Sequence, residues 1–98
     1  MTAYLVAAVD VEDPGAYAAY RERVPAILAA FGGRYLVRGG TQTVLEGTWP
    51  GGRTVVIAFL DRASAEAVYM SDAYRQILPI RQGASTGALV IVDGVEPA

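Results

Sequence analysis

Two segments of the chain share one layout, and this internal parallel limits the available folds more than any other feature. The segments read LVAAVDVEDPGAY (residues 5–17) and VVIAFLDRASAEAVY (residues 55–69). Each begins with an apolar, β-rich run, continues with an acidic residue suited to capping a helix, and ends in a helical pattern containing a tyrosine. The chain is therefore expected to repeat a strand–helix unit.

The helix of the first unit has a marked beginning and end. Asp13 supplies an N-cap acceptor and Pro14 suits the first helical position. Apolar residues then recur at steps of three and four, at Tyr17, Tyr20, Val24, Ile27 and Phe31. Pro25 cannot donate to the carbonyl of Arg21, so we expect the helix to bend or restart there. Gly32 and Gly33 are expected to end it.

The second unit predicts a helix over residues 62–70 and a further helical segment over residues 72–81. Asp61 and Ser71 are the expected N-caps, and Pro79 is expected to disturb the last turn. A loop over residues 82–87 would then lead to a final strand over residues 88–94.

Two glycine pairs flank the short run RYLVR (residues 34–38), and they raise the alternatives of a phosphate cradle and simple turns. A phosphate loop needs its glycines between a strand and the following helix, where free amides meet the anion. Here a helix precedes the first pair, and another strand is expected after the second. We therefore interpret Gly39–Gly40 as a hairpin turn with a return strand over residues 41–47, ahead of a strong strand over residues 53–60.

The order β-α-β-β-α-β predicts an α+β, ferredoxin-like domain over residues 1–98, with an antiparallel sheet and both helices on one face. Successive side chains of a strand point to opposite faces of the sheet, and here both faces receive apolar residues. One face receives Val55, Ile57 and Phe59, Leu5, Ala7 and Val9, and Leu89 and Ile91. The other receives Val56, Ala58 and Leu60, Tyr4, Val6 and Ala8, and Val90 and Val92. A bare apolar face of that size needs a cover, and the simplest cover is the same face of a second copy. The sequence predicts a homodimer.

Composition excludes several classes of function. The chain has no histidine, lysine, cysteine or asparagine, which removes Ser-His and Cys-His pairs, Schiff-base and P-loop lysines, and histidine-ligated metals. No metal or cofactor is expected. The formal charge of -2 and eight scattered arginines provide no basic face for nucleic acid. The lack of a long apolar run or signal peptide predicts a cytoplasmic protein with no membrane partner.

Nearly the whole chain resembles a family of short bacterial proteins catalogued as domain of unknown function 1330, within the dimeric α/β-barrel superfamily. The resemblance rests on AYLVAAVDVEDPGAYAAYRERVP, FGGRYLVRGG, VLEGTWPGGR, VVIAF and SDAYRQILPIR. It implies the ferredoxin-like fold and a dimeric α/β barrel. The family itself has no assigned activity, so function must be argued from individual side chains.

The cleft between the sheet and its helices is the expected pocket, and few polar residues around it lack a structural reason. Arg38 is either a solvated charge paired with Glu46 or, together with Arg81, a clamp for an organic acid. Trp49 is either a plug at the dimer rim or an aromatic lid, and Glu46 is a candidate base if it is desolvated. The remaining candidates are tyrosines that are either core residues or pocket walls: Tyr20, Tyr35, Tyr69 and Tyr74.

Three functions remain open at this point, and catalytic residues stay unknown. The first is a dimeric binding protein for a small aromatic or carboxylic metabolite, held in the cleft between the sheet and the helices. The second is a cofactor-free monooxygenase or isomerase in which Glu46 or a tyrosine moves a proton. The missing histidine and asparagine disfavour this enzyme. The third is a purely structural dimer.

Overall fold

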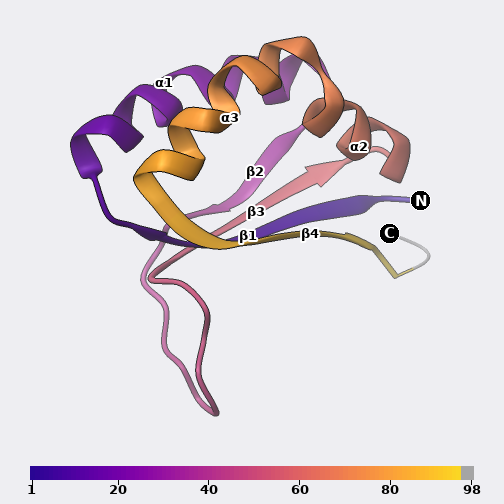
Figure 1. Cartoon of the computed structure of the whole chain (residues 1–98). Helices are drawn as coiled ribbons and strands as arrows, with labels where there is room; N and C mark the ends of the chain where they lie inside the picture. Colours follow the sequence, from indigo (N-terminus) through magenta and orange to yellow (C-terminus); the bar gives the residue numbers. More distant parts are fainter. Residues whose placement is uncertain (96–98) are drawn as a thin grey trace.

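A computed structural model describes residues 1–95 of the chain, so residues 96–98 of the expected domain lie outside the described residues. The elements follow in the order β1 (Ala3–Val11), α1 (Pro14–Ala30), β2 (Arg34–Arg38), β3 (Arg53–Phe59), α2 (Arg62–Met70), α3 (Asp72–Ala84) and β4 (Ser85–Asp93) (Figure 1). This order is β-α-β-β-α-β, with the second helical region divided into two helices.

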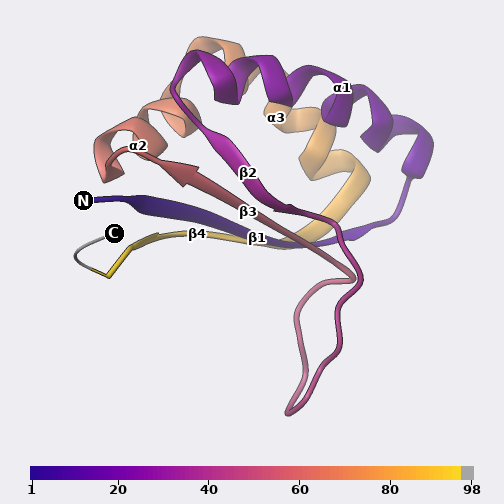
Figure 2. The same cartoon turned by 180° about the vertical axis from the view of Figure 1, so that it is seen from behind.

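The four strands form one antiparallel sheet in the order β2-β3-β1-β4. Leu5 in the central strand β1 lies opposite Ile57 of β3 and Ile91 of β4. All three helices cover the same face of the sheet, as the two opposite views show (Figures 1 and 2). The expected α+β, ferredoxin-like architecture is confirmed.

The three helices begin at the caps that the sequence predicts. Asp13 accepts a hydrogen bond from the Ala16 amide (3.1 Å), and Asp61 accepts one from the Ser64 amide (2.8 Å). Ser71 closes α2 and opens α3, because its hydroxyl donates to the carbonyl of Val68 (2.7 Å) and accepts from the Tyr74 amide (3.2 Å). These caps satisfy backbone groups that a helix end leaves without partners.

Pro25 lies inside α1 and Pro79 inside α3, and both helices continue past them. Of the two outcomes expected at Pro25, a bend or a restart, the restart is therefore wrong. The missing amide of Pro25 leaves the carbonyl of Arg21 without its helical donor. Arg38 of β2 takes that place, since its Nη2 donates to this carbonyl at 3.1 Å. A side chain from the neighbouring strand thus satisfies the polar group that the proline exposes.

The expected loop over residues 82–87 is also wrong, because α3 runs to Ala84 and β4 starts at Ser85. β4 pairs with β1, and Gly87 lies opposite Val9 in this pairing. A Cβ on Gly87 would collide with the carbonyl oxygen of Ala8, so this position needs glycine. Ser85 is buried and its hydroxyl donates to the carbonyl of Arg81 (2.6 Å).

Residues 39–52 form an extended arm that leaves the sheet on the side away from the helices (Figures 1 and 2). The expected return strand over residues 41–47 does not form, and β3 is the strand that pairs with β2. β3 offers apolar side chains to both faces of the sheet, whereas the arm has no second layer against which to bury its residues. Within the arm, Gln42 Nε2 donates to the carbonyl of Gly51 at 2.8 Å.

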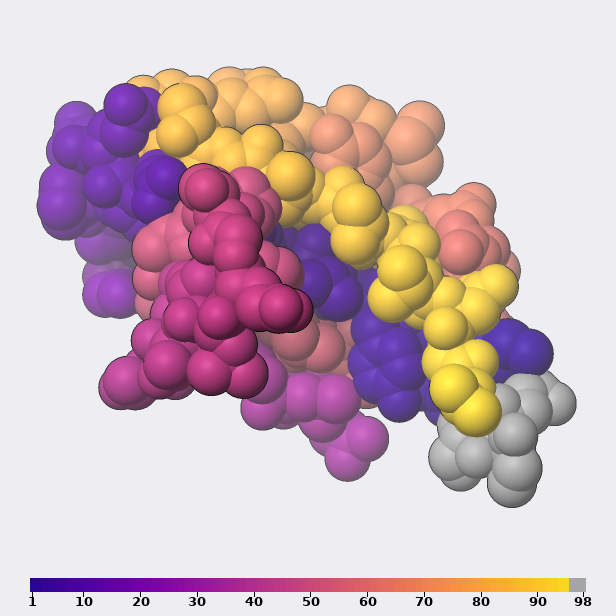
Figure 3. Space-filling model, turned by 90° about the horizontal axis from the view of Figure 1, so that it is seen from below, coloured from indigo at the N-terminus to yellow at the C-terminus, as the bar shows by residue number. Residues whose placement is uncertain are grey.

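The core lies between the helices and one face of the sheet. Phe59, Ile77, Val9 and Val68 are its largest fully buried side chains. The opposite face, which we call the open face, is formed by the alternate residues of the strands, among them Tyr4, Val6, Val56, Val90 and Val92. Val90 and Val92 are exposed, and atoms of β1 and β4 stand uncovered beside the arm when the molecule is seen from this side (Figure 3). Both faces of the sheet are apolar, as the alternation predicts.

Candidate functional site

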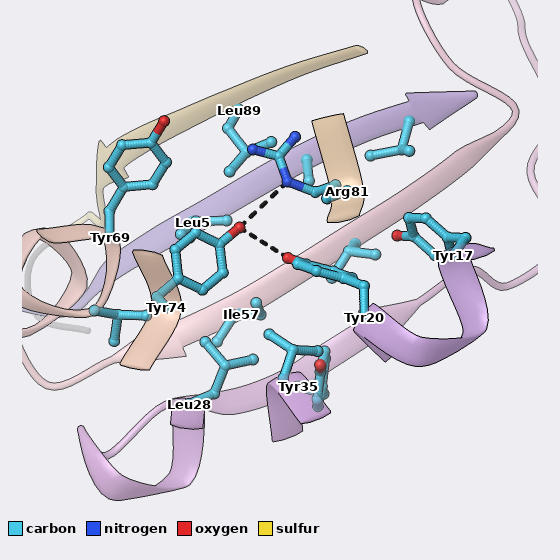
Figure 4. Close-up of a pocket in the computed structure, with 15 residues that line it drawn as sticks. Leu5, Tyr17, Tyr20, Leu28, Tyr35, Ile57, Tyr69, Tyr74, Arg81 and Leu89 are labelled. Atoms are coloured by element: carbon cyan, nitrogen blue, oxygen red, sulfur yellow. Dashed lines mark hydrogen bonds between the residues drawn. The ribbon is translucent and has the colours of Figure 1, made fainter. Parts of the chain in front are cut away.

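A narrow cavity of about 50 Å³ lies between the sheet and the helices. Aliphatic side chains make up nine of its fifteen lining residues, and most of them come from β1, β3 and α1. The polar-tipped residues that line it are Tyr17, Tyr20, Tyr35, Tyr69, Tyr74 and Arg81 (Figure 4). Since one water molecule needs about 10–15 Å³ of such space, the cavity holds only a few atoms.

The polar groups of the cavity meet in one cluster. The hydroxyl oxygens of Tyr20 and Tyr74 are 2.8 Å apart, and the Nε of Arg81 donates to the Tyr74 hydroxyl at 3.3 Å (Figure 4). Both tyrosines are buried, with 8% of Tyr20 and 3% of Tyr74 exposed. We call these three residues the Tyr20–Tyr74–Arg81 cluster.

The helices place this cluster. Tyr20 lies on the apolar stripe of α1, and Tyr74 is the residue whose amide the Ser71 cap holds at the start of α3. Arg81 follows Tyr74 by seven residues, which is two helical turns, so both side chains point from the same side of α3. The cluster therefore joins α1 to α3 above the sheet.

The Tyr20–Tyr74–Arg81 cluster has more hydrogen-bond donors than its own hydrogen bonds use. Two hydroxyl groups carry two protons, and the bond between Tyr20 and Tyr74 uses one of them. The other proton stays free, whichever tyrosine donates. Arg81 uses one of its five N–H groups on Tyr74. Arg81 forms no ion pair within residues 1–95, because the two ion pairs there join Arg62 to Glu66 and to Asp93. The cluster is thus suited to a group that accepts hydrogen bonds.

Burial raises the pKa of two tyrosines of the cavity, Tyr20 and Tyr35. The pKa of Tyr20 is raised well above its usual value, first by burial and then by the neighbouring Tyr74. Burial also raises the pKa of Tyr35, although the positive charges of Arg38 and Arg53 oppose that shift. A buried phenol with a raised pKa stays neutral near pH 7, so it can donate a hydrogen bond but is not present as the phenolate that would act as a base.

The cavity contains five of the eight residues that the sequence singled out: Tyr20, Tyr35, Tyr69, Tyr74 and Arg81. Tyr17 also lines it and was predicted only as a member of the apolar stripe of α1. Its position three residues before Tyr20 was the available signal, because residues three apart share a helix face. The tilted Tyr17 and Tyr20 rings are 5.5 Å apart.

Arg38 lies outside the cavity lining, so it is not joined with Arg81 as an anion clamp. Its guanidinium carbon lies 4.6 Å from the centroid of the Tyr35 ring, while its Nη2 donates to the carbonyl of Arg21. The alternative ion pair with Glu46 does not form among residues 1–95. Arg38 therefore braces β2 against α1.

Glu46 and Trp49 lie on the arm, in a separate exposed groove of about 500 Å³. The Trp49 Nε1 donates to Thr54 Oγ1 at 3.1 Å, and about half of the Trp49 side chain (47%) is exposed. Glu46 is exposed, so the desolvation that would turn it into a base is missing.

The part of the chain that the structure describes has no group of three or more acidic, histidine or cysteine side chains placed to hold a metal ion. Across the same residues, no helix combines the length and the apolar character that crossing a bilayer requires.

Comparison with known proteins gives one family and several structures. The model of the family described as "Domain of unknown function (DUF1330)" matches residues 2–95. No curated protein matches the sequence. The chain is similar to the RPA0582 protein of unknown function from Rhodopseudomonas palustris, with a TM-score of 0.79 and 18% identity over 98% of this chain and 84% of that one.

Two further solved structures share the fold. SnoaB, a cofactor-independent oxygenase from Streptomyces nogalater, gives a TM-score of 0.65 with 12% identity over 99% of this chain and 98% of that one. HapK from Hahella chejuensis gives a TM-score of 0.62 with 12% identity over 98% of this chain and 95% of that one. At such low identity these likenesses establish the fold and not the activity.

Proposed function

Because the chain belongs to the family described as Domain of unknown function (DUF1330), which assigns no activity, we propose its function from the cavity itself. The proposed function is the binding of a small aromatic or carboxylic metabolite between the sheet and the helices. The observation that carries the proposal is the Tyr20–Tyr74–Arg81 cluster, a group of spare hydrogen-bond donors inside an otherwise apolar cavity.

The chemistry of the wall defines the class of ligand. Aliphatic residues and tyrosine rings favour an apolar or aromatic body. The free hydroxyl proton and the remaining N–H groups of Arg81 favour a carbonyl, carboxylate or phenolate oxygen on that body. A ligand with both features would offer an acceptor to the spare N–H groups of Arg81 and an apolar body to the wall.

A cofactor-free monooxygenase or isomerase is the alternative, and the fold shared with SnoaB favours considering it. Such an enzyme needs a base to remove a proton from its substrate. The cavity contains no carboxylate, and its buried Tyr20 has a raised pKa that opposes ionisation. Binding without chemistry is therefore the function that the residues support best.

We also propose that the binding protein is a homodimer joined through the open face. Val6 lies at the centre of that face, opposite Val56 on one side and Val90 on the other. Such a row of aliphatic side chains resembles the buried half of a stacked pair of sheets more than a surface that meets water.

The test is a thermal-shift titration with benzoate and 1-naphthoate on three chains: wild type, Arg81→Gln and Arg38→Gln. Wild-type protein at a ligand concentration of 100 times Kd should gain about 2.7 kcal/mol of unfolding free energy. Arg81→Gln should bind about 10- to 100-fold more weakly, because a hydrogen bond to a charged group contributes roughly 1.5–3 kcal/mol. Arg38→Gln, the matched control outside the cavity, should bind as the wild type does.

The three functions give different results in this titration. Equal weakening by both substitutions would contradict the role of Arg81. No shift with either acid, or with the corresponding uncharged alcohols, would favour a purely structural dimer. Slow conversion of a bound aromatic compound in air, detected by mass spectrometry, would favour the oxygenase instead.

A further inference from the structure

The cavity has two larger hollows outside it, on the side of the edge strand β4. One, of about 440 Å³, lies between α3 and β4 and is lined by Tyr69, Arg81, Gln82, Ser85, Thr86 and Leu89 with Gly87. The other, of about 270 Å³, lies between α2 and β4. We call the first the outer cleft.

Tyr69 and Leu89 line the cavity and both outer hollows, so they form the wall that separates the inside from the outside. Tyr69 comes from the end of α2 and Leu89 from β4, and both are only partly buried. Leu5 and Ile57, which face the helices from β1 and β3, are buried. The helices thus cover the centre of the sheet and leave a seam along β4.

Tyr69 is held by ring contacts. Its ring centroid is 5.7 Å from that of Tyr74, and the guanidinium carbon of Arg75 lies 5.0 Å from it. None of the hydrogen bonds found within residues 1–95 involves its hydroxyl, and Figure 4 shows that group directed away from the Tyr20–Tyr74 pair. Rotation of the Tyr69 ring would therefore break these two ring contacts but no hydrogen bond.

The size of the cavity makes such a movement necessary for ligand entry. A dry cavity of about 150 Å³ accommodates benzene in a protein interior. The cavity here, at about 50 Å³, is too small for an aromatic ring unless its wall moves. Rotation of Tyr69 away from Leu89 would join the cavity to the outer cleft.

Arg81 belongs to both compartments, since it lines the cavity and the outer cleft. Its Nε is bound to Tyr74 on the inner side, and its terminal nitrogens are directed towards Leu89 in Figure 4. The outer cleft adds the hydroxyl-bearing residues Ser85 and Thr86. A carboxylate in the outer cleft would therefore meet Arg81 together with Ser85 and Thr86, while the aliphatic and tyrosine side chains of the cavity would contact its ring.

We propose that Tyr69 and Leu89 form a gate along β4, and that the ligand is an amphipathic aryl carboxylate with its ring inside the cavity and its carboxylate in the outer cleft at Arg81. This inference rests on the proposed binding function. It adds the route of entry, the orientation of the ligand and the residues that control its size.

The gate is tested with 4-fluorobenzoate followed by 19F NMR, which gives both Kd and the exchange rate. A gate whose open state is populated at about 10% or less slows association at least about tenfold. Tyr69→Ala should therefore raise the association rate by about tenfold or more. Leu89→Ala opens the gate from the strand side and should act in the same direction, with Val92→Ala on the open face as its control.

The outcomes separate the gate from the binding function. Equal association rates in wild type, Tyr69→Ala and Leu89→Ala, with 4-fluorobenzoate still bound, would overturn the gate alone. Absence of binding to all of these chains would overturn the binding function and the gate with it. If Tyr69→Ala does not fold, as judged by circular dichroism, Leu89→Ala decides the question.

The orientation is tested by placing a negative charge in the outer cleft. Thr86 lines that cleft and not the inner cavity, so Thr86→Asp should weaken the binding of 4-fluorobenzoate several-fold and leave 4-fluorobenzyl alcohol unaffected. An equal effect on both compounds, or on neither, would overturn the outward position of the carboxylate.

Discussion

Tyr20 links the cavity to the stability of the protein at high pH. Its pKa in the folded state is raised by burial and by Tyr74, whereas an exposed tyrosine has a pKa near 10. Above that pH the unfolded chain loses a proton that the folded chain keeps. Stability is therefore fully present below about pH 10 and falls as the pH rises further, by up to about 1.4 kcal/mol per pH unit for this group.

Tyr20→Phe should make that decline shallower, even though it costs about 1 kcal/mol at neutral pH through the lost hydrogen bond to Tyr74. Urea unfolding measured between pH 8 and pH 11 compares the two slopes. Identical slopes in the two chains would contradict a raised pKa at this position.

Arg38 illustrates what the sequence left open about single residues. The consequence of Pro25, an unpaired carbonyl at Arg21, was predictable from the chemistry of proline. The donor that satisfies the carbonyl was not, because β2 and α1 approach each other only in the tertiary structure. By contrast, Tyr74 and Arg81 are two turns apart on one helix, and their meeting could be read from spacing alone.

Ser71 is the junction between α2 and α3, and its hydrogen bond to the Tyr74 amide fixes the start of α3. Ser71→Ala removes an N-cap acceptor and should lower stability by about 1 kcal/mol, within a range of roughly 0.5–2. For a domain of this size, 1 kcal/mol corresponds to a fall of about 4–8 °C in Tm.

The thermal melt of Ser71→Ala should be compared with that of Ser71→Asp, which keeps a capping oxygen. The aspartate chain should recover most of the loss. A Tm equal to that of the wild type in the alanine chain would contradict the importance of this cap.

The sequence predicted best those elements whose ends are set by a particular side chain, such as a helix cap. Asp13, Asp61 and Ser71 define helix starts through their own side chains. The return strand over residues 41–47 failed for a different reason. The segment contains β-branched residues at Thr41, Thr43 and Val44, but a strand exists only where a neighbour pairs with it, and β3 already occupies the one paired edge of β2. Local pattern cannot decide between two competing partners.

For the molecule as a whole, we expect an aspartate on one face of the sheet to unfold the chain and an aspartate on the other face to affect only its association. Ile57 faces the helices and is 5% exposed, so Ile57→Asp should unfold the chain. Val6 faces the other way, at the centre of the open face. Val6→Asp should leave the fold intact and separate the proposed dimer, because a two-fold interface would bury the new charge twice.

Sedimentation velocity at micromolar concentration, together with circular dichroism, distinguishes these responses. Val6→Asp should sediment as a folded 10.3 kDa monomer and the wild type as a dimer. A wild-type chain that sediments as a monomer under these conditions would contradict the association through the open face.

The arm gives the protein a built-in optical reporter. Its Trp49 is the only tryptophan in the chain, it is half exposed, and it lies outside the cavity lining. The colour of its emission therefore depends on what surrounds the arm, while the cavity contributes only tyrosine signals. Fluorescence excited at the red edge of the absorption band, where tyrosine does not absorb, would come from Trp49 alone. Its emission would change when a neighbouring molecule binds against the arm and would not change when a ligand occupies the cavity.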